Sequence, residues 1–174
     1  LANNTTGTQN TAVGQSAGNA ITTGVQNVII GTNAGDALTD ADHNVAVGMN
    51  ALTADTLGSK STAIGTGALG TQNFTSATNV YNTAVGYDAG VSVTTGIQNT
   101  LIGSLAGDAL TDADSNVAIG YSALTADTLG SNSVAIGHSA LGSQAFTTAT
   151  SSYNTAVGFY AGLNVTTAVQ NTLI

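Results

Sequence analysis

Glycine recurs in this chain at fixed intervals, each time directly after a short apolar triplet such as TAV, VII or TAI. The intervals between these glycines are 17, 17, 17 and 21 residues, and the same four intervals then repeat. The nine glycines are Gly14, Gly31, Gly48, Gly65, Gly86, Gly103, Gly120, Gly137 and Gly158. Such a fixed period is the signature of a repeat protein, whose units bury their apolar faces by stacking on one another.

Four of these short units form a larger unit of 72 residues, here called a superunit. The first superunit is residues 11–82 and the second is residues 83–154; they align without a gap and share 49 identities in 72 positions. Residues 155–174 begin a third, partial superunit. We therefore interpret the 174 residues as one continuous segment, which we expect to belong to a longer polypeptide.

The triplet before each glycine has the composition of a β-strand. Its first residue is Thr or Val and its third is Val or Ile in all nine units, and such β-branched residues favour strands. These two residues lie on one face, because side chains alternate along a strand. The middle residue is Ala in seven units, with Ile29 and Leu101 in the other two. We expect the β-branched face to fill the inside of a coil, and the Ala face to meet another wall of the coil or another chain.

A single strand per 17-residue unit favours an all-β, parallel β-solenoid of about nine coils. No apolar spacing of 3.6 residues persists, so a helical repeat is excluded. Asn or Ser precedes every strand, and stacked Asn side chains can form a hydrogen-bonded ladder. Every fourth coil is longer by four residues, which predicts excursions within 69–82 and 141–154. Each excursion carries a Phe and a Tyr that could pin the loop or offer a contact surface.

Three segments carry a family resemblance: NSVAIGHSAL (132–141), NVAIGYSAL (116–124) and STAIGTGAL (61–69). They resemble the head repeats of YadA-like trimeric autotransporter adhesins, and similar repeats occur in phage tail-fibre proteins. The resemblance covers essentially the whole chain. It implies a left-handed parallel β-roll in which three identical chains pack around one axis. The coils of 17 and 21 residues and the strict 72-residue period depart from the family pattern.

The charge composition restricts the partners of the chain. It has one Lys, no Arg, no Glu and nine Asp, for a net charge of −8. Nucleic-acid binding requires clustered cations, so we expect no nucleic-acid partner. No run of about 20 apolar residues is present, so we expect no membrane insertion in this segment.

An acidic motif, GDALTDAD, occurs once in each superunit. Its carboxylates could bind Ca²⁺, which prefers oxygen ligands, although no EF-hand pattern is present. They could also supply the acid pair of a glycan-cleaving module. The simpler interpretation is a solvated acidic edge, so we expect no cofactor and no catalytic site. The residues concerned are Asp36, Asp40, Asp42, Asp108, Asp112 and Asp114.

The two residues after each glycine vary while the rest of the repeat does not. This variation indicates positions free of packing constraints, and several of these residues are aromatic, a residue type that often anchors binding. We expect the positions to face outward and carry surface contacts; alternatively, the rings cover the coil edge or pack between chains. The candidates are Tyr87, Tyr121, His138, Phe159 and Tyr160.

Together these features predict a structural and adhesive fibre segment that acts as a stiff rod rather than as an enzyme. Its expected partners are two further copies of itself and a host-cell surface glycan or protein. Its expected location is extracellular, in a virion tail fibre or a similar cell-surface appendage. The alternatives are the head of a bacterial trimeric autotransporter adhesin, a glycan-degrading fibre module, and a monomeric solenoid.

Overall fold

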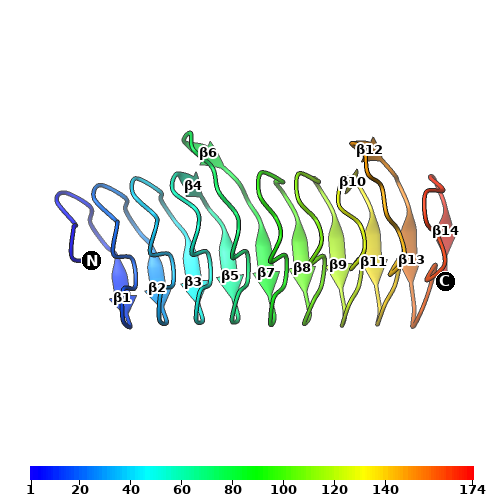
Figure 1. The fold of residues 1–174 in the computed structure, drawn as a ribbon, viewed down its shortest axis with the longest axis horizontal. Coiled ribbons are helices and arrows are strands. Elements are labelled where there is room, and N and C mark those ends of the chain that lie inside the picture. The colour runs from blue at the N-terminus through cyan, green and yellow to red at the C-terminus, as the bar shows by residue number, and fades with distance from the viewer.

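The computed structural model describes residues 1–174, which form short strands and turns without any helix. The coils stack side by side into a rod with the two termini at opposite ends (Figure 1). The strands are β1 (Thr11–Val13), β2 (Val28–Ile30), β3 (Val45–Val47), β4 (Gly58–Ser59), β5 (Thr62–Ile64), β6 (Thr78–Asn79), β7 (Thr83–Val85), β8 (Thr100–Ile102), β9 (Val117–Ile119), β10 (Gly130–Ser131), β11 (Val134–Ile136), β12 (Thr150–Ser151), β13 (Thr155–Val157) and β14 (Thr172–Leu173).

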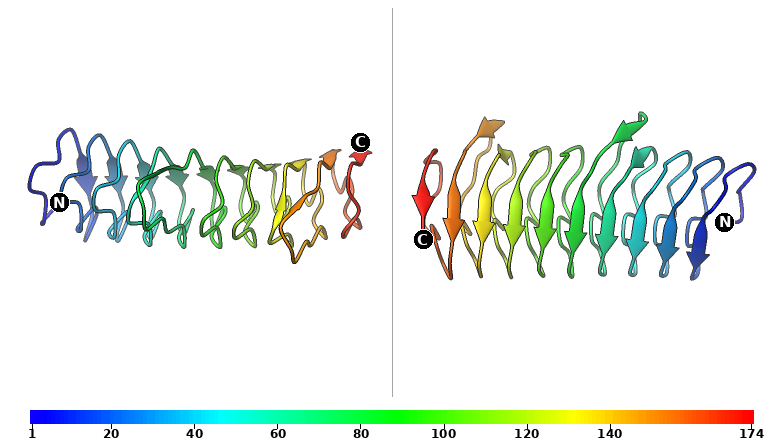
Figure 2. Two further views of the ribbon diagram at one scale, coloured as in Figure 1. Left: turned by 90° about the horizontal axis from the view of Figure 1, so that it is seen from above. Right: turned by 180° about the vertical axis from the view of Figure 1, so that it is seen from behind.

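One parallel sheet runs the length of the rod. Its ten strands follow the order β1-β2-β3-β5-β7-β8-β9-β11-β13-β14, and every pairing is parallel. The strands lie in one row when seen from above and from behind (Figure 2). The register places equivalent residues opposite each other, as Thr11 opposite Val28 and Val13 opposite Ile30. The β-solenoid prediction is confirmed, with a tenth strand beyond the nine coils that the glycines mark.

The glycine that follows each strand is required because the backbone of the next coil lies so close to it. Gly14 has φ +132°, and a Cβ atom built there would lie 2.5 Å from the carbonyl oxygen of Gly31. The same steric conflict with the next glycine in the column recurs along the rod up to Gly137. Any side chain would therefore push neighbouring coils apart, which explains why the column contains glycine alone.

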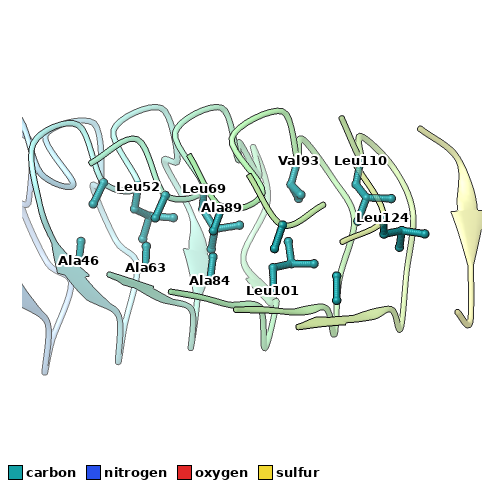
Figure 3. Packing of buried hydrophobic residues seen from close by; sticks show 14 of the residues in the cluster. Ala46, Leu52, Ala63, Leu69, Ala84, Ala89, Val93, Leu101, Leu110 and Leu124 are labelled. Carbon is teal, nitrogen blue, oxygen red and sulfur yellow. The ribbon is translucent and has the colours of Figure 1, made fainter. Parts of the chain in front are cut away.

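The middle residue of each strand points into the coil, where Ala46, Ala63 and Ala84 are fully buried. Figure 3 shows them facing Leu and Val side chains from the other walls of the coil. The expectation that the β-branched face would fill the coil is therefore wrong, because that face points outward. The interior is narrow and already holds Leu side chains such as Leu52 and Leu69. Alanine fits the remaining space, and the Ala face meets another wall of the same coil.

A larger strand residue is accommodated by glycines around it. Leu101 is fully buried, and a Cβ atom on Gly107 would lie 2.8 Å from its Cδ2 atom. A Cβ atom on Gly90, in the preceding coil, would meet its Cδ1 atom at 2.5 Å. Ile29 stands in the same relation to Gly35. The two bulky strand residues thus lie against glycines, whose lack of a side chain leaves room for them in the narrow interior.

The Asn column before the strands forms the expected ladder, chiefly through the backbone. The Oδ1 atom of Asn27 accepts the backbone N–H of Asn44 at 2.9 Å, and the Oδ1 atom of Asn44 accepts that of Ser61 at 2.8 Å. The Nδ2 atom of Asn44 donates to the carbonyl oxygen of Gly58 at 2.9 Å. These buried amides satisfy backbone groups in turns that have no strand partner, as buried polar groups require.

The two longer coils form the predicted excursions, which project as β6 and β12 from the edge opposite the ends of the main strands (Figure 1). Each makes a small parallel sheet with the preceding coil, β4 with β6 and β10 with β12. Phe74 and Phe146 are buried, whereas Tyr81 and Tyr153 are exposed. The Phe therefore pins each loop to the rod and the Tyr remains at the surface.

Candidate functional site

The outer side of the main sheet, here called the strand face, is an exposed apolar strip. It consists of the first and third residues of each strand of the main sheet: the first is Thr or Val, and the third is Val or Ile except in β14, which has only two residues. Ile30, Ile64 and Ile102 are each 38% exposed. No charged side chain lies in either column. The strand face is therefore an uncharged strip of Val, Ile and Thr side chains that are exposed or half-buried along the rod.

A second surface, here called the turn edge, consists of the two residues that follow each glycine. It lies where the chain turns after each strand, along the lower edge of Figure 1. Tyr87, Tyr121, Phe159 and Tyr160 are exposed there, and Phe159 is exposed over 70% of its surface. His138 is half-buried among them. All residues of the turn edge are exposed or half-buried, as expected for the variable positions, except Gly67, which is buried.

Four of the five candidate residues form one cluster, here called the aromatic ladder: Tyr121, His138, Phe159 and Tyr160. The His138 ring centroid lies 5.2 Å from those of Tyr121 and Phe159 and 5.3 Å from that of Tyr160. The Phe159 and Tyr160 centroids are 4.0 Å apart. The rings come from the turns after β9, β11 and β13, so the stacking of successive coils creates the ladder.

Tyr87 lies outside the aromatic ladder, because Ser104 occupies the intervening turn. Its neighbour Asp88 raises the pKa of Tyr87 above the ordinary value of 10.0. The main cause is hydrogen bonding between the phenol and the Asp88 carboxylate, followed by the negative charge of that carboxylate and a contribution from desolvation. Tyr87 is therefore an isolated ring with an acidic neighbour.

The acidic motifs are not gathered into a metal site, since no group of three or more His, Cys, Asp or Glu side chains could hold an ion. The carboxylates instead bond to neighbouring coils. Asp36 accepts the Thr53 hydroxyl at 2.6 Å, and Asp40 accepts the Thr23 hydroxyl at 2.5 Å. Asp108 and Asp112 make the same bonds in the second superunit. These hydrogen bonds join each acidic coil to the coils on both sides.

Two other aspartates, Asp55 and Asp127, were not singled out from the sequence. Asp55 is fully buried and accepts the backbone N–H groups of Gly58 and Phe74 at 3.0 Å each. Its other oxygen accepts the Gln72 amide at 2.6 Å. Asp127 repeats these contacts in the second superunit. The signal in the sequence was their position seven residues after a glycine, where most coils carry Ile, Leu or Val.

Gln72 completes the Asn ladder where Ser61 has no amide. Its Nε2 atom donates to the Ser61 hydroxyl at 3.0 Å, and its Oε1 atom accepts the Asn82 amide at 2.9 Å. The longer coil thus carries a side chain that bridges the interrupted ladder, held in turn by Asp55. This network supports the fold and lies away from the exposed surfaces.

The surface contains no pocket, and no helix is present that could cross a membrane. Comparison with protein-family models, with curated proteins and with solved structures finds no match.

Proposed function

We propose that this chain is a segment of a homotrimeric, extracellular fibre, of the kind found in phage tail fibres or similar surface appendages. In this proposal the coils form a left-handed β-roll, and three copies pack through their strand faces around a common axis. The fibre serves as a stiff rod and presents its turn edges to a host-cell surface glycan or protein. The exposed apolar strand face of the rod carries the proposal.

Support for self-association comes from the shape and chemistry of the strand face. Equivalent residues of all ten strands stack in register, so the face is a regular strip along the rod rather than a local patch. Val and Ile side chains such as Ile64 and Ile102 would leave water if they met the same strip of another copy. A strip lying parallel to an axis suits closed cyclic packing of identical chains.

The distribution of charge is compatible with such packing. The Asp side chains that give the chain its net charge of −8 lie in turns or in the coil interior, and none belongs to the strand face. Three copies could therefore associate without bringing carboxylates into the contact. The trimer number and the left hand of the roll come from the resemblance to YadA-like repeats, which a bacterial adhesin head would share.

Sedimentation equilibrium tests the proposal directly. We expect the chain to sediment as a trimer. Placing two cations on the strand face, with Ile64→Lys and Ile102→Lys together, should give monomers because buried like charges are strongly unfavourable. Circular dichroism then shows whether the monomers keep their β-structure. Met49→Lys is the matched control, because Met49 is an exposed apolar residue of the turn edge.

Two results would contradict the proposal. The first is a monomeric wild-type chain at all concentrations, which would leave the strand face without a partner. The second is release of new reducing ends from bacterial polysaccharides, which would indicate a glycan-degrading module. A trimer that attaches to cells and leaves polysaccharides intact supports the fibre.

A further inference from the structure

The aromatic ladder is the one place in the chain where aromatic rings gather. All four aromatic ring contacts in the structure occur among Tyr121, His138, Phe159 and Tyr160. The His138 Nδ1 atom is shielded from solvent without a hydrogen-bond partner, and no other buried side-chain polar atom lacks one. Neighbouring rings rather than polar bonds therefore hold the imidazole in place.

The fold does not require these rings. The corresponding residues, 72 positions earlier in the chain, are Met49, Thr66, Tyr87 and Asp88, which make no aromatic contact with one another. The backbone is nevertheless the same, with φ +138° at Gly48 and +134° at Gly120. The rings of the aromatic ladder are thus an addition to a turn edge that folds equally well without them.

The chemistry around the ladder is neutral. The other turn-edge residues beside the rings are Ser122 and Ser139, and no Asp, Lys or Arg occurs at the turn edge from Ser104 to Tyr160. The single cation of the chain, Lys60, contacts Tyr81 in the first superunit instead. An anionic polymer would find no cation here and a cationic polymer would find no carboxylate, so this part of the turn edge suits an uncharged partner.

The backbone of the turn edge is already satisfied. The carbonyl oxygen of Tyr121 accepts the N–H of Ser139 at 2.9 Å, and that of His138 accepts the N–H of Tyr160 at 3.0 Å. An extended peptide adding itself as a strand requires free backbone groups at an edge. The ladder offers instead at least one aromatic ring in each of three successive coils, together with two phenol and two serine hydroxyls.

We propose that Tyr121, His138, Phe159 and Tyr160 form a stacking site for a linear, neutral polysaccharide that lies along the rod. The apolar C–H faces of successive sugar rings stack on successive aromatic rings, and sugar hydroxyls bond to the Tyr and Ser hydroxyls. This inference rests on the proposed fibre function, because it names the glycan that such a fibre would contact.

NMR titration of the full chain tests the site, since its only two histidines give separate reporters. The probes are cellohexaose, chitohexaose and maltohexaose, with hexagalacturonate as the anionic control. We expect at least one neutral probe to shift the His138 ring signals while those of His43, which lies outside the turn edge, stay fixed. The absence of a His138 shift with all three neutral probes would overturn the proposal.

A matched pair of double variants separates binding from structure. Tyr121→Ser with Phe159→Ser should weaken hexasaccharide binding by roughly tenfold or more, the size of effect typical of an anchor residue. Met49→Ser with Tyr87→Ser alters the equivalent positions 72 residues earlier and should change binding less than about twofold.

Sedimentation of the same variants distinguishes failure of this inference from failure of the fibre proposal. A trimer lost in the Tyr121 and Phe159 variant alone would mean that the rings pack between copies, which overturns the glycan site. A wild-type trimer that attaches to cells but ignores every neutral probe also removes the glycan site and leaves the fibre intact. A wild-type monomer that binds a neutral probe would overturn the fibre proposal and leave the glycan site intact.

Discussion

The two superunits have the same backbone but different turn edges. All eight turn-edge positions differ between residues 11–82 and 83–154, whereas 49 of the other 64 positions are identical. The glycine column, the buried Asp network and the four strand positions of each superunit recur with the same contacts. Packing therefore fixes most of the chain, and the substitutions concentrate where side chains project into solvent.

This contrast separates the buried residues that build the rod from the turn-edge residues that form its variable surface. In the first superunit the turn edge carries Gln, Thr, Met and small polar residues, and in the second it carries Tyr87 and Tyr121 with His138. Because each coil repeats the same turn, a side chain placed there meets its counterpart one coil away. A surface pattern can then change without any change in the core.

The largest expected effect should be equal in the two superunits. Gly48→Ala and Gly120→Ala each place a methyl group 2.5 Å from the carbonyl oxygen of the next glycine, at a φ that disfavours side chains. We expect each to cost more than about 3 kcal/mol, since backbone strain and a steric clash add together. Hydrogen exchange of the strand amides measures this loss coil by coil.

Ser104→Ala is the control for these variants, because it changes a turn-edge residue in a coil with the same backbone. It should leave the exchange rates of the strands unchanged. If Gly48→Ala were harmless and Gly120→Ala disruptive, the two superunits would not share one packing scheme.

A smaller effect, again equal in both superunits, is expected from the buried aspartates. Asp55→Asn and Asp127→Asn replace an acceptor by an amide donor facing the Gln72 or Gln144 amide. Leaving buried donors unpaired costs about 1–3 kcal/mol. Thermal unfolding monitored by circular dichroism gives the loss of stability, with the exposed Asp40→Asn as a control expected to be nearly neutral. Nearly neutral values for Asp55→Asn and Asp127→Asn as well would show that the network tolerates rearrangement.

Transferring the aromatic ladder to the positions 72 residues earlier would give the chain a second copy of the proposed glycan site without a large change in stability. Met49→Tyr, Thr66→His, Tyr87→Phe and Asp88→Tyr together reproduce the ladder one superunit earlier. Isothermal titration with a neutral hexasaccharide that shifts the His138 signals should then give twice the binding stoichiometry per chain. An unchanged stoichiometry would show that the rings alone do not define the site.

The smallest effect concerns Tyr87, whose counterpart Gln15 does not titrate. Asp88 raises the pKa of Tyr87, so the folded chain holds the phenol proton more tightly than the unfolded chain. This contribution to stability is present below pH 10 and is lost as the pH rises through the folded-state pKa. Asp88→Asn should move the titration of Tyr87, followed by NMR of the ring carbons, towards lower pH. A titration unaffected by this variant would mean that Asp88 does not act on the phenol.

The sequence was sufficient to predict the repeat, nine of the ten strands of the main sheet and the glycine column, because one short period imposes all three. It was insufficient to assign the two faces of the strands, since Ala46 and its flanking valines are all apolar and only the width of the coil decides which enters. Asp55 and Gln72 escaped notice because their contacts join residues 17 positions apart. The turn edge was identified from variation, but the closeness of Tyr121, His138 and Phe159 depends on how coils stack in space.

The unbroken register of the main sheet has an evolutionary corollary. Since every strand meets a neighbour with the same hydrogen-bonding frame, an in-frame tandem duplication of 72 codons would insert four coils whose two new joints match all existing ones. At about 4.8 Å per strand spacing, each such genetic event would lengthen the filament by roughly 19 Å. The length of the rod could thus evolve by copying, while divergence of the copied turns would diversify the side chains that the turn edge presents.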